Sequence, residues 1–299
     1  MVDALQGDAS HSEGQGWGMT LATAFDDAEA LARMFAWTEA HLAVRQDPLL
    51  AWRWRPDAGV TDFNNATDGD LFYAWALLKA ARQFGVPHYA ERAAAVADAI
   101  DKILIREAPN GQLVLRPAAE RFSTPDVETI NPSYYMPLAM HALAAAFDIP
   151  RLARVSDDGE ALLARIAKQR LVPDWVEITP EGLQPPMNLP ATYGYDALRV
   201  PLYLTWSGRF AHPAVSRARG LVSTQEIESV PVRVDEAGEI SERSDAPGYI
   251  AVARLLRCTG MAGSSTKIPR FIAQQSYYPA TLHLLAVIAA AQAAPHCIT

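Results

Sequence analysis

Apolar residues recur at nearly every third or fourth position along most of this chain, the spacing that buries one face of an α-helix. We expect the first helical stretch, 17–42, to be one helix, or two helices with Asp26 and Asp27 opening the second. Strand signals are few, and 112–116 and 230–234 are expected to form short hairpins. The helical stretches are 17–42, 68–84, 88–105, 132–147, 151–170, 195–206, 212–221, 246–258 and 272–291. The sequence therefore predicts an all-α protein of helix hairpins. Because no repeat of about 34 to 47 residues is visible, we expect a closed ring rather than a solenoid.

The composition is that of a folded protein with a large core. Of 299 residues, 50% are hydrophobic and 20% are charged, and the formal net charge is −8. No linker or change in composition divides the chain, so we expect a single domain over 1–299. An acidic chain without a basic run is a poor partner for nucleic acid or anionic membranes. No apolar run reaches the 18 or so residues of a membrane span, so we expect no membrane insertion.

The cysteines and histidines suggest neither a disulfide framework nor a metal site. The chain has two cysteines, Cys258 and Cys297, and the second lies in a tail that we expect to be frayed. We therefore expect no disulfide, and we predict no metal and no cofactor because no zinc-type spacing occurs. Residues 1–12 lack the basic and apolar regions of a signal peptide. Either the protein is not exported, or the chain begins after the signal.

The first polar cluster is the run His-Ser-Glu-Gly-Gln-Gly-Trp-Gly-Met at 11–19. Each glycine weakens a helix interior by about 1 kcal/mol relative to alanine, so glycines here suggest that something approaches the backbone closely. Glu13 is then a candidate functional carboxylate. The structural alternative is a cap, with Ser12 at the N-cap and Glu13 in the positive first turn.

The second cluster is Asn-Asn-Ala-Thr-Asp-Gly-Asp at 64–70. It resembles a fragment of a calcium loop, but the final acidic ligand is missing and a helix begins at once. The plain interpretation is helix capping by Thr67 or Asp68. The functional interpretation is a carboxylate, Asp68 or Asp70, held at a helix N-terminus toward a polar ligand.

The third cluster is Tyr-Gly-Tyr-Asp-Ala-Leu-Arg at 193–199. Asp196 and Arg199 are three residues apart, which places both on one face of a helix, and the plain interpretation is an ion pair on its surface. Tyr195 directly before the carboxylate suggests more. Aromatic rings pack on the C–H faces of sugars while carboxylates and amides bind the hydroxyls. Trp52 and Tyr135 stand at similar loop–helix junctions and extend the pattern.

These runs resemble the motifs of glycoside hydrolase family 8. The runs 11–19, 64–70, 131–135 (Asn-Pro-Ser-Tyr-Tyr) and 195–199 match successive family blocks in the right order, and the resemblance covers nearly the whole chain. It is greatest to the bacterial cellulases. The resemblance implies an (α/α)6 barrel and inverting endo-hydrolysis of β-1,4-glucan, with a functional link to the cellulose synthase machinery.

The resemblance also implies roles for individual residues. Glu13 would be the general acid and Asp196 the general base. Asp68 would hold the distorted sugar at the cleavage point, with Asp70 as the alternative for that role. Arg199 would orient Asp196 or a neighbouring hydroxyl. The aromatic residues expected to line subsites are Trp52, Tyr135 and Tyr195.

Several alternatives remain open at this point. The same machinery could act on chitosan, xylan or mixed-linkage glucan, and a non-catalytic glucan-binding protein would keep the aromatic residues. The family implies a periplasmic or secreted location. Relatives carry a helix before the Ser-Glu-Gly block. We therefore expect either that the chain is truncated and its barrel lacks the first helix, or that the translation start of the chain has been assigned too late.

Overall fold

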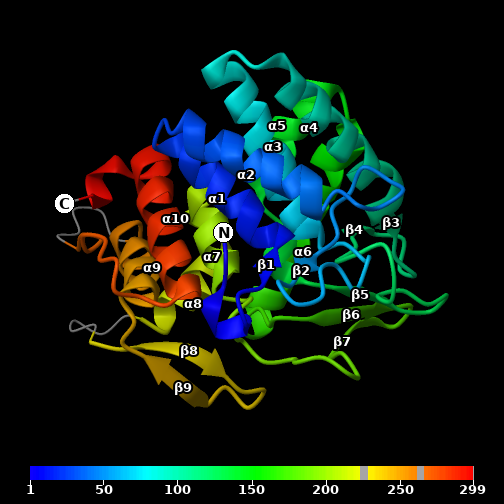
Figure 1. Ribbon diagram of the computed structural model, residues 1–299. Coiled ribbons are helices and arrows are strands. Elements are labelled where there is room, and N and C mark those ends of the chain that lie inside the picture. Colours follow the sequence, from blue (N-terminus) through cyan, green and yellow to red (C-terminus); the bar gives the residue numbers. More distant parts are fainter. Residues whose placement is uncertain (223–227, 261–265, 299) are drawn as a thin grey trace. The chain divides into compact units, whose positions relative to one another are not determined.

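The computed structural model describes residues 1–222, 228–260 and 266–298 (Figure 1). The chain forms two compact units. Unit 1 contains Met1–Glu128 and Ala139–Ser156, and unit 2 contains Thr129–Leu138 and Asp157–Thr299. Helices α5 (Pro137–Phe147) and α6 (Pro150–Gln169) contribute residues to both units. The expectation of one domain over 1–299 stays a prediction.

Unit 1 is built on α1 (Ser12–Ala24), α2 (Ala28–His41), α3 (Thr67–Phe84) and α4 (Pro87–Ala99). Helix α1 packs against α2 and α3, and α3 packs against α4 (Figure 1). The break between α1 and α2 confirms the two-helix alternative, because the Asp27 side chain caps α2 by accepting from the Ala30 N–H. Gly85, with φ of 68°, ends α3 in the left-handed conformation that glycine adopts without strain. Pro87 then opens α4.

Short strands and single turns complete unit 1. Strand β1 (Ser10–His11) pairs with β2 (Arg53–Trp54), placing Ser10 opposite Trp54. Strand β3 (Ile105–Glu107) pairs with β4 (Leu113–Leu115), which confirms the hairpin expected near 112–116. A 3₁₀ turn, η1, covers Ala4–Gln6, and a π-helical turn, η2 (Ile100–Leu104), continues α4.

Unit 2 is built on α7 (Arg199–Trp206), α8 (Pro213–Gly220), α9 (Pro247–Cys258) and α10 (Tyr277–Ala293). Helix α10 packs against α7 and α9, and α8 packs against the same two helices. Prolines open α8 and α9, where the missing N–H costs nothing. The 3₁₀ turns are η3 (Pro132–Tyr134) and η4 (Pro295–Cys297).

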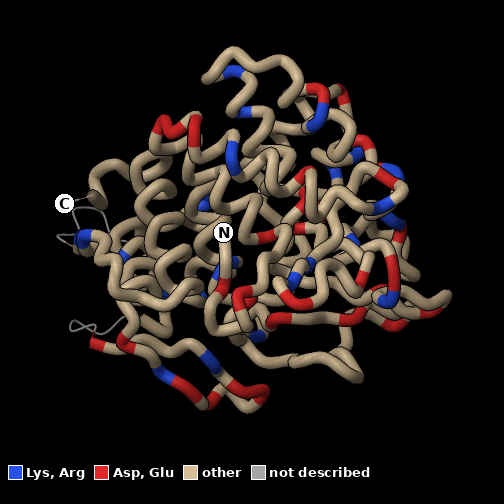
Figure 2. Tube along the Cα trace, viewed as in Figure 1, with Lys and Arg blue, Asp and Glu red and all other residues tan. Residues whose placement is uncertain are grey.

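The strands of unit 2 lie in what the sequence showed as loops. Strands β5 (Glu128–Ile130), β6 (Val176–Thr179) and β7 (Gly182–Gln184) form a sheet in that order, and only Glu128 of β5 belongs to unit 1. Strand β8 (Val230–Val234) pairs with β9 (Ile240–Ser244), which confirms the second expected hairpin. This β8–β9 hairpin carries more acidic than basic residues, whereas α10 carries no charged residue (Figure 2). Within the described residues, no helix has both the length and the apolar character that crossing a membrane requires.

The expectation about the cysteines is wrong. Cys258 at the end of α9 and Cys297 in η4 form a disulfide. Cys297 is fully buried, and its N–H donates to the Ala294 carbonyl, so the tail is anchored rather than frayed. The expectation failed because two cysteines that are 39 residues apart show no pattern in the sequence, and only the fold brings them together.

Candidate active site

Glu13 lies in the first turn of α1, half-buried, where α1 crosses α3. The crossing is unusually close. A Cβ atom on Gly69 of α3 would lie 2.6 Å from the Glu13 backbone nitrogen and 2.2 Å from Ser12 Oγ. Gly16 on α1 is also tight, because a Cβ there would lie 2.9 Å from the Tyr73 nitrogen. Glycines on both helices therefore bring the two N-terminal turns into contact.

This arrangement corrects the capping prediction for Ser12. Helix α1 begins at Ser12 itself, His11 occupies the N-cap, and Ser12 Oγ has no hydrogen-bond partner among the described residues. Likewise α3 begins at Thr67, with Ala66 at the N-cap, and the Thr67 hydroxyl donates to the Arg116 carbonyl instead. Among the glycines of 11–19, Gly16 thus serves the close crossing of α1 and α3 rather than a cap.

Trp52 lies next to the start of α1. Its carbonyl accepts from the Ser12 N–H at 3.0 Å, and its ring stacks on His11 with ring centres 5.8 Å apart. The Arg53 guanidinium lies over the Trp52 ring at 4.5 Å. Trp52 is half-buried, and these contacts fix its indole beside the turn that carries Glu13.

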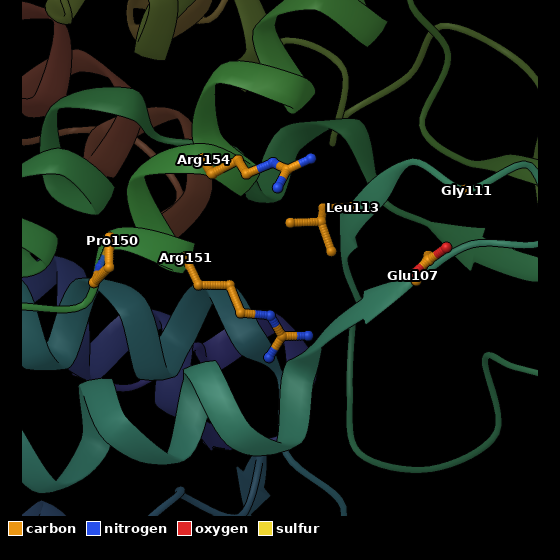
Figure 3. Close-up of a pocket in the computed structure, with 6 residues that line it drawn as sticks. All are labelled: Glu107, Gly111, Leu113, Pro150, Arg151 and Arg154. Carbon is orange, nitrogen blue, oxygen red and sulfur yellow. The ribbon is translucent and has the colours of Figure 1, made fainter.

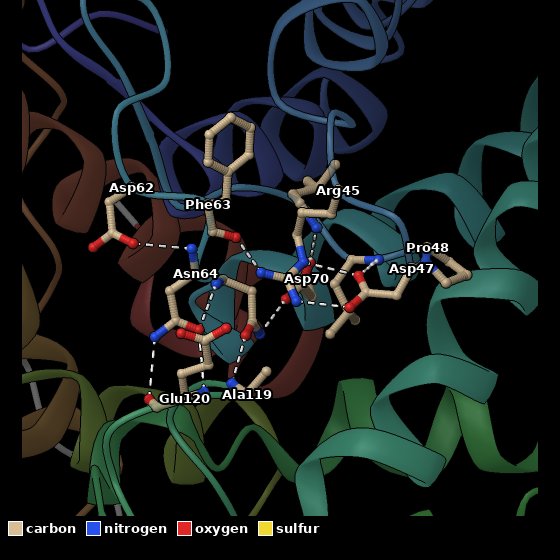
Figure 4. A network of polar contacts seen from close by, with 12 residues as sticks. Arg45, Asp47, Pro48, Asp62, Phe63, Asn64, Asp70, Ala119 and Glu120 are labelled. Atoms are coloured by element: carbon tan, nitrogen blue, oxygen red, sulfur yellow. Dashed lines mark hydrogen bonds and ion pairs between the residues drawn. The ribbon is translucent and has the colours of Figure 1, made fainter.

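Asp68 and Asp70 share the first turn of α3, but their surroundings differ. Asp68 Oδ1 accepts from the N–H of Gly69, the residue that contacts the Glu13 backbone. Asp70 is fully buried, and both of its oxygens are engaged. Oδ1 accepts from the Leu50 N–H at 2.7 Å, and Oδ2 accepts from Asn65 Nδ2 at 2.8 Å (Figure 4).

The polar contacts around Asp70 hold the loops of unit 1 together. Burial raises the pKa of Asp70 to about 7, although its hydrogen bonds and the nearby charge of Arg45 favour the ionised form. Arg45 pairs with Asp47 at 2.6 Å, and the Asn65 amide oxygen accepts from the Ala119 N–H (Figure 4). Asp70 therefore ties the chain around residue 50 and residue 65 to α3.

Asp196 lies in unit 2, in the turn directly before α7 rather than on a helix as expected. Each of its oxygens accepts one hydrogen bond: Oδ1 from Arg199 Nη2 at 3.0 Å, and Oδ2 from Asn131 Nδ2 at 2.9 Å. The predicted pairing of Asp196 with Arg199 is therefore present. The Asp196 side chain is 33% exposed, whereas that of Arg199 is 4% exposed.

A closed ring of hydrogen bonds orients these two donors. Arg199 Nη2 also donates to Ser133 Oγ at 2.7 Å, and Ser133 Oγ donates to the Asn131 amide oxygen at 2.7 Å. The oxygen of Asn131 is thereby occupied, so its NH₂ group faces Asp196. Two charge-assisted hydrogen bonds to one carboxylate fix its orientation. Such a group can accept a proton from a neighbouring water molecule.

Asp174, just before β6, supports the same turn from inside. Its Oδ1 accepts from the N–H groups of Gly194 at 3.1 Å and Ala197 at 2.7 Å. Burial and the nearby charge of Asp196 raise the pKa of Asp174 to about 6, against the two hydrogen bonds and Arg199.

The predicted aromatic residues of unit 2 fall into two environments. Tyr195 is exposed, and its hydroxyl donates to Glu242 of β9 at 2.6 Å. Its ring contacts those of Tyr249 and Tyr278, and the Tyr278 hydroxyl donates to the Tyr195 carbonyl at 2.7 Å. Tyr135 is 1% exposed, and its ring lies so close to Gly159 that a Cβ there would be 2.1 Å from it.

The structure thus gathers the predicted residues in two groups. Unit 1 brings together Glu13, Asp68, Asp70 and Trp52, and unit 2 brings together Asp196, Arg199 and Tyr195. Tyr135 also lies in unit 2, but its ring is buried against Gly159. Sequence reasoning did not assign roles to Asn131, Ser133 and Asp174. Asn131 and Ser133 stand in the run 131–135, so that run was a usable signal for both of them. Asp174 had none, because it lies 22 residues from Asp196 in an apparent loop.

A cavity of about 640 Å³ lies elsewhere in unit 1, between the start of α6 and the β3–β4 hairpin (Figure 3). Arg151 and Arg154 extend toward it from α6, and Glu107 is the carboxylate among its lining residues. Arg151 donates to the carbonyls of Asp101 and Ile105, so its guanidinium holds the end of η2. None of the predicted site residues lines this cavity.

One group in unit 2 has the composition of a metal site. Ligand atoms of Cys258, His296 and Cys297 lie within 4.8 Å of one another. Because both sulfurs are joined in the disulfide, the group offers no thiolate ligand.

Residues 3–292 match the family model of the glycosyl hydrolases family 8. The chain is 35% identical to a probable endoglucanase of Novacetimonas hansenii, over 98% of this chain and 86% of that protein. The solved endo-β-1,4-glucanase from Acetobacter xylinum superposes with a TM-score of 0.87 at 33% identity, covering 98% of this chain and 92% of the other. A family 8 endo-β-1,4-glucanase from an Achatina fulica gut metagenomic library gives a TM-score of 0.88 at 32% identity, covering 97% and 91%.

These likenesses extend over nearly the whole chain, and the structural ones include solved family 8 enzymes. They confirm the predicted all-α class and the (α/α)6 barrel, with which the ten α-helices of the described residues are consistent. They also confirm the resemblance carried by the four ordered motifs. The chain belongs to glycosyl hydrolase family 8.

Proposed function

We propose that this protein is an inverting endo-β-1,4-glucanase that acts on cellulose or soluble cellulose derivatives. The family and the endoglucanases among its relatives support this activity. The single observation that carries the chemistry is the setting of Asp196. It is a partly exposed carboxylate whose two oxygens are held by Asn131 and Arg199.

In the proposed reaction, Glu13 is the acid and Asp196 is the base. Glu13 donates its proton to the glycosidic oxygen as the bond from that oxygen to C1 breaks. A water molecule attacks C1 from the opposite face and gives its proton to Asp196. One water is added across the bond, the new reducing end is the α-anomer, and solvent returns the proton from Asp196 to Glu13.

The two carboxylates need different environments for these roles. A general acid must hold its proton near neutral pH, which burial favours. Glu13 is half-buried against a close helix crossing, in the first turn of α1. Room for the attacking water requires about 6.5 to 9.5 Å between the carboxyl groups of an inverting pair.

We assign Asp68, Trp52 and Tyr195 to substrate binding, whereas Tyr135 is 1% exposed and offers a sugar no accessible ring face. Asp68, in the turn that contacts the Glu13 backbone, would hold the sugar at the cleavage point. Asp70 is fully engaged in holding loops, which favours Asp68 over Asp70 for this role. Trp52 and Tyr195 would pack on sugar faces.

The proposal includes a periplasmic or secreted location and a role beside cellulose synthesis. A disulfide persists in oxidising compartments, so the Cys258–Cys297 bond supports export. Cellulose also lies outside the cytoplasm, where an exported enzyme meets it. In a cellulose-producing host, deletion of the gene is expected to change cellulose yield, and an unchanged yield would contradict the biosynthetic role.

The decisive experiment measures reducing ends released from carboxymethyl cellulose by the wild type, by Glu13→Gln and by Glu29→Gln. NMR of short incubations identifies the first anomer formed. We expect α-anomer from the wild type and a loss of about 10² to 10⁴ in rate for Glu13→Gln. Glu29 also lies in the first turn of a helix but is paired with Arg33 on the surface, so Glu29→Gln should retain full activity.

The outcomes separate the alternatives. Full activity in Glu13→Gln, or β-anomer as the first product, would overturn the proposed mechanism. If the folded wild type is silent on carboxymethyl cellulose, a panel of chitosan, xylan and mixed-linkage glucan tests the same chemistry on another glycan. Binding of glucan without turnover on any of them would indicate a glucan-binding protein.

A further inference from the structure

We propose that Asp174 is a positioning residue for Asp196, and that it acts by fixing the backbone of the turn at residues 193–198. This inference rests on the proposed function, because it assigns Asp174 a part in the reaction through the general base. Asp174 is 9% exposed and makes no direct contact with substrate in this proposal.

Asp174 accepts hydrogen bonds from the backbone on both sides of Asp196 along the chain. A single oxygen, Oδ1, accepts from the N–H of Gly194 and from the N–H of Ala197, which flank Tyr195 and Asp196 along the chain. The Asp174 N–H donates to the Thr192 carbonyl at 2.9 Å. Asp174 therefore binds the turn at its beginning and at its end, and the two residues between them must project away from it.

Gly194 shows how closely the turn is fitted to Asp174. A Cβ on Gly194 would lie 2.3 Å from Asp174 Oδ2, and its three nearest neighbours are all atoms of the Asp174 carboxylate. The backbone of Gly194 is not in the left-handed region, so its conformation does not require glycine. Glycine is needed at this position because the Asp174 carboxylate occupies the space.

Other contacts also anchor the turn, among them the Arg199 N–H, which donates to the Asp196 carbonyl at 3.0 Å, and the Tyr278 hydroxyl, which donates to the Tyr195 carbonyl. The backbone of Tyr193 pairs with that of Val234 at 3.1 and 2.9 Å, and the Leu198 N–H donates to the Gly194 carbonyl. These bonds hold the ends of the turn. Between them, the N–H of Ala197 is bound by Asp174 alone among the described contacts. Its release would allow Asp196 to leave Asn131 and Arg199.

The charges around Asp174 show why it is not itself the base. Asp174 interacts electrostatically with Asp196, Arg199 and Tyr193. Asp174 is buried, and its Oδ1 already accepts two N–H groups. It is therefore poorly placed to take a proton from a water molecule beside the sugar. Asp196 is the more exposed of the two carboxylates, so the inner one supports the outer one.

The first experiment compares Asp174→Ala with Asp174→Asn on a soluble cello-oligosaccharide, with kcat and KM measured separately. The asparagine amide keeps an oxygen at Oδ1 for both N–H groups, whereas alanine removes it. We expect kcat to fall about a hundredfold in Asp174→Ala, a size typical of a displaced catalytic group, with KM changed less than about threefold. Asp174→Asn should recover most of kcat.

The second experiment is a double-mutant cycle with Gly194→Ala, which tests the same contact from the other side. The added methyl displaces the Asp174 carboxylate, so kcat should fall about tenfold in the wild-type background. In the Asp174→Ala background there is no carboxylate to displace, and Gly194→Ala should then cost less than about twofold. Gly220→Ala is the matched control, because a Cβ there meets nothing within 4 Å.

The wild type and Glu13→Gln are run alongside, so that the two hypotheses fail in different ways. A silent wild type overturns the proposed function. An active wild type with normal kcat in Asp174→Ala overturns the positioning role. Equal losses in Asp174→Asn and Asp174→Ala, or purely additive losses in the cycle, also overturn it. A stability control is Asp27→Ala, which removes a capping carboxylate from α2 and should leave kcat unchanged.

Discussion

Lys79 brings a positive charge into the interior of unit 1 on helix α3. Its ammonium nitrogen is buried without a hydrogen-bond partner among the described residues, and it lies 4.5 Å from the centre of the Trp75 ring. Burial lowers the pKa of Lys79 from its ordinary 10.5. The contact with the ring face offsets only part of the cost of removing this charge from water.

At the scale of this residue, we predict that Lys79→Met stabilises the protein at pH 7 and that the gain shrinks as the pH rises toward 10.5. Below the lowered pKa, both the folded and the unfolded wild type carry the charge, so the full burial cost is present. Between the two pKa values the folded form loses its proton first, and wild-type stability rises with pH. Urea unfolding of both proteins at pH 7 and pH 10 measures the difference.

Lys102→Met provides the matched control for this prediction. Lys102 is exposed and pairs with Asp98 on the surface, so its replacement should produce no such pH-dependent gain. A Lys79→Met protein that is less stable than the wild type at pH 7 would contradict the prediction. It would show that the ammonium group has a net favourable environment.

At the scale of elements, the crossing of α1 and α3 decides where Glu13 lies. We predict that Gly69→Ala lowers both stability and activity. The new methyl would meet the backbone of Ser12 and Glu13 at 2.7 and 2.6 Å, so the helices must move apart. Overpacking of this kind costs about 1 to 3 kcal/mol, and a displaced general acid costs about a hundredfold in kcat.

Thermal unfolding and cellulose-derivative hydrolysis test this prediction together. Adding Ser12→Ala should not rescue Gly69→Ala, because the contacts with the backbone remain. Gly220→Ala again serves as the control for a glycine with open space. Wild-type kcat in Gly69→Ala would show that the position of Glu13 does not depend on the crossing.

At the scale of the whole molecule, the disulfide joins the end of α9 to the last described turn. Closing a loop of this length removes about 4 kcal/mol of chain entropy from the unfolded state at 25 °C in the chain-entropy model. We predict that Cys258→Ala with Cys297→Ala lowers the free energy of unfolding by about 2 to 5 kcal/mol while leaving kcat unchanged. Urea unfolding with and without reductant measures the change.

The oxidation state of the same disulfide reports the compartment in which the protein matures. Producing cells are denatured in the presence of a thiol-alkylating reagent, so that any free cysteine of the protein is labelled. No cysteine should be labelled if the protein matures in an oxidising compartment. Fully labelled Cys258 and Cys297 in mature protein would contradict export. Equal stability of the double variant and the oxidised wild type would contradict the structural role of the bond.

The sequence by itself determined the features that depend on neighbouring residues. The 3.6-residue periodicity located the helices, and prolines and glycines marked their ends. The spacing of three residues between Asp196 and Arg199 predicted their contact, even though the chain there forms a turn before α7 rather than a helix. The four ordered motifs identified the family. These signals are local because backbone geometry and steric preference act over a few residues.

Only the tertiary structure decided which distant groups meet. Asn131 reaches Asp196 across 65 positions, and the Asp174 carboxylate binds Ala197 across 23. The disulfide joins residues 39 apart, and Gly69 needs to be glycine only because α1 crosses α3 there. Such contacts depend on the path of the whole chain, which the local pattern does not encode. The residues that orient the proposed base became visible only when folding brought them together.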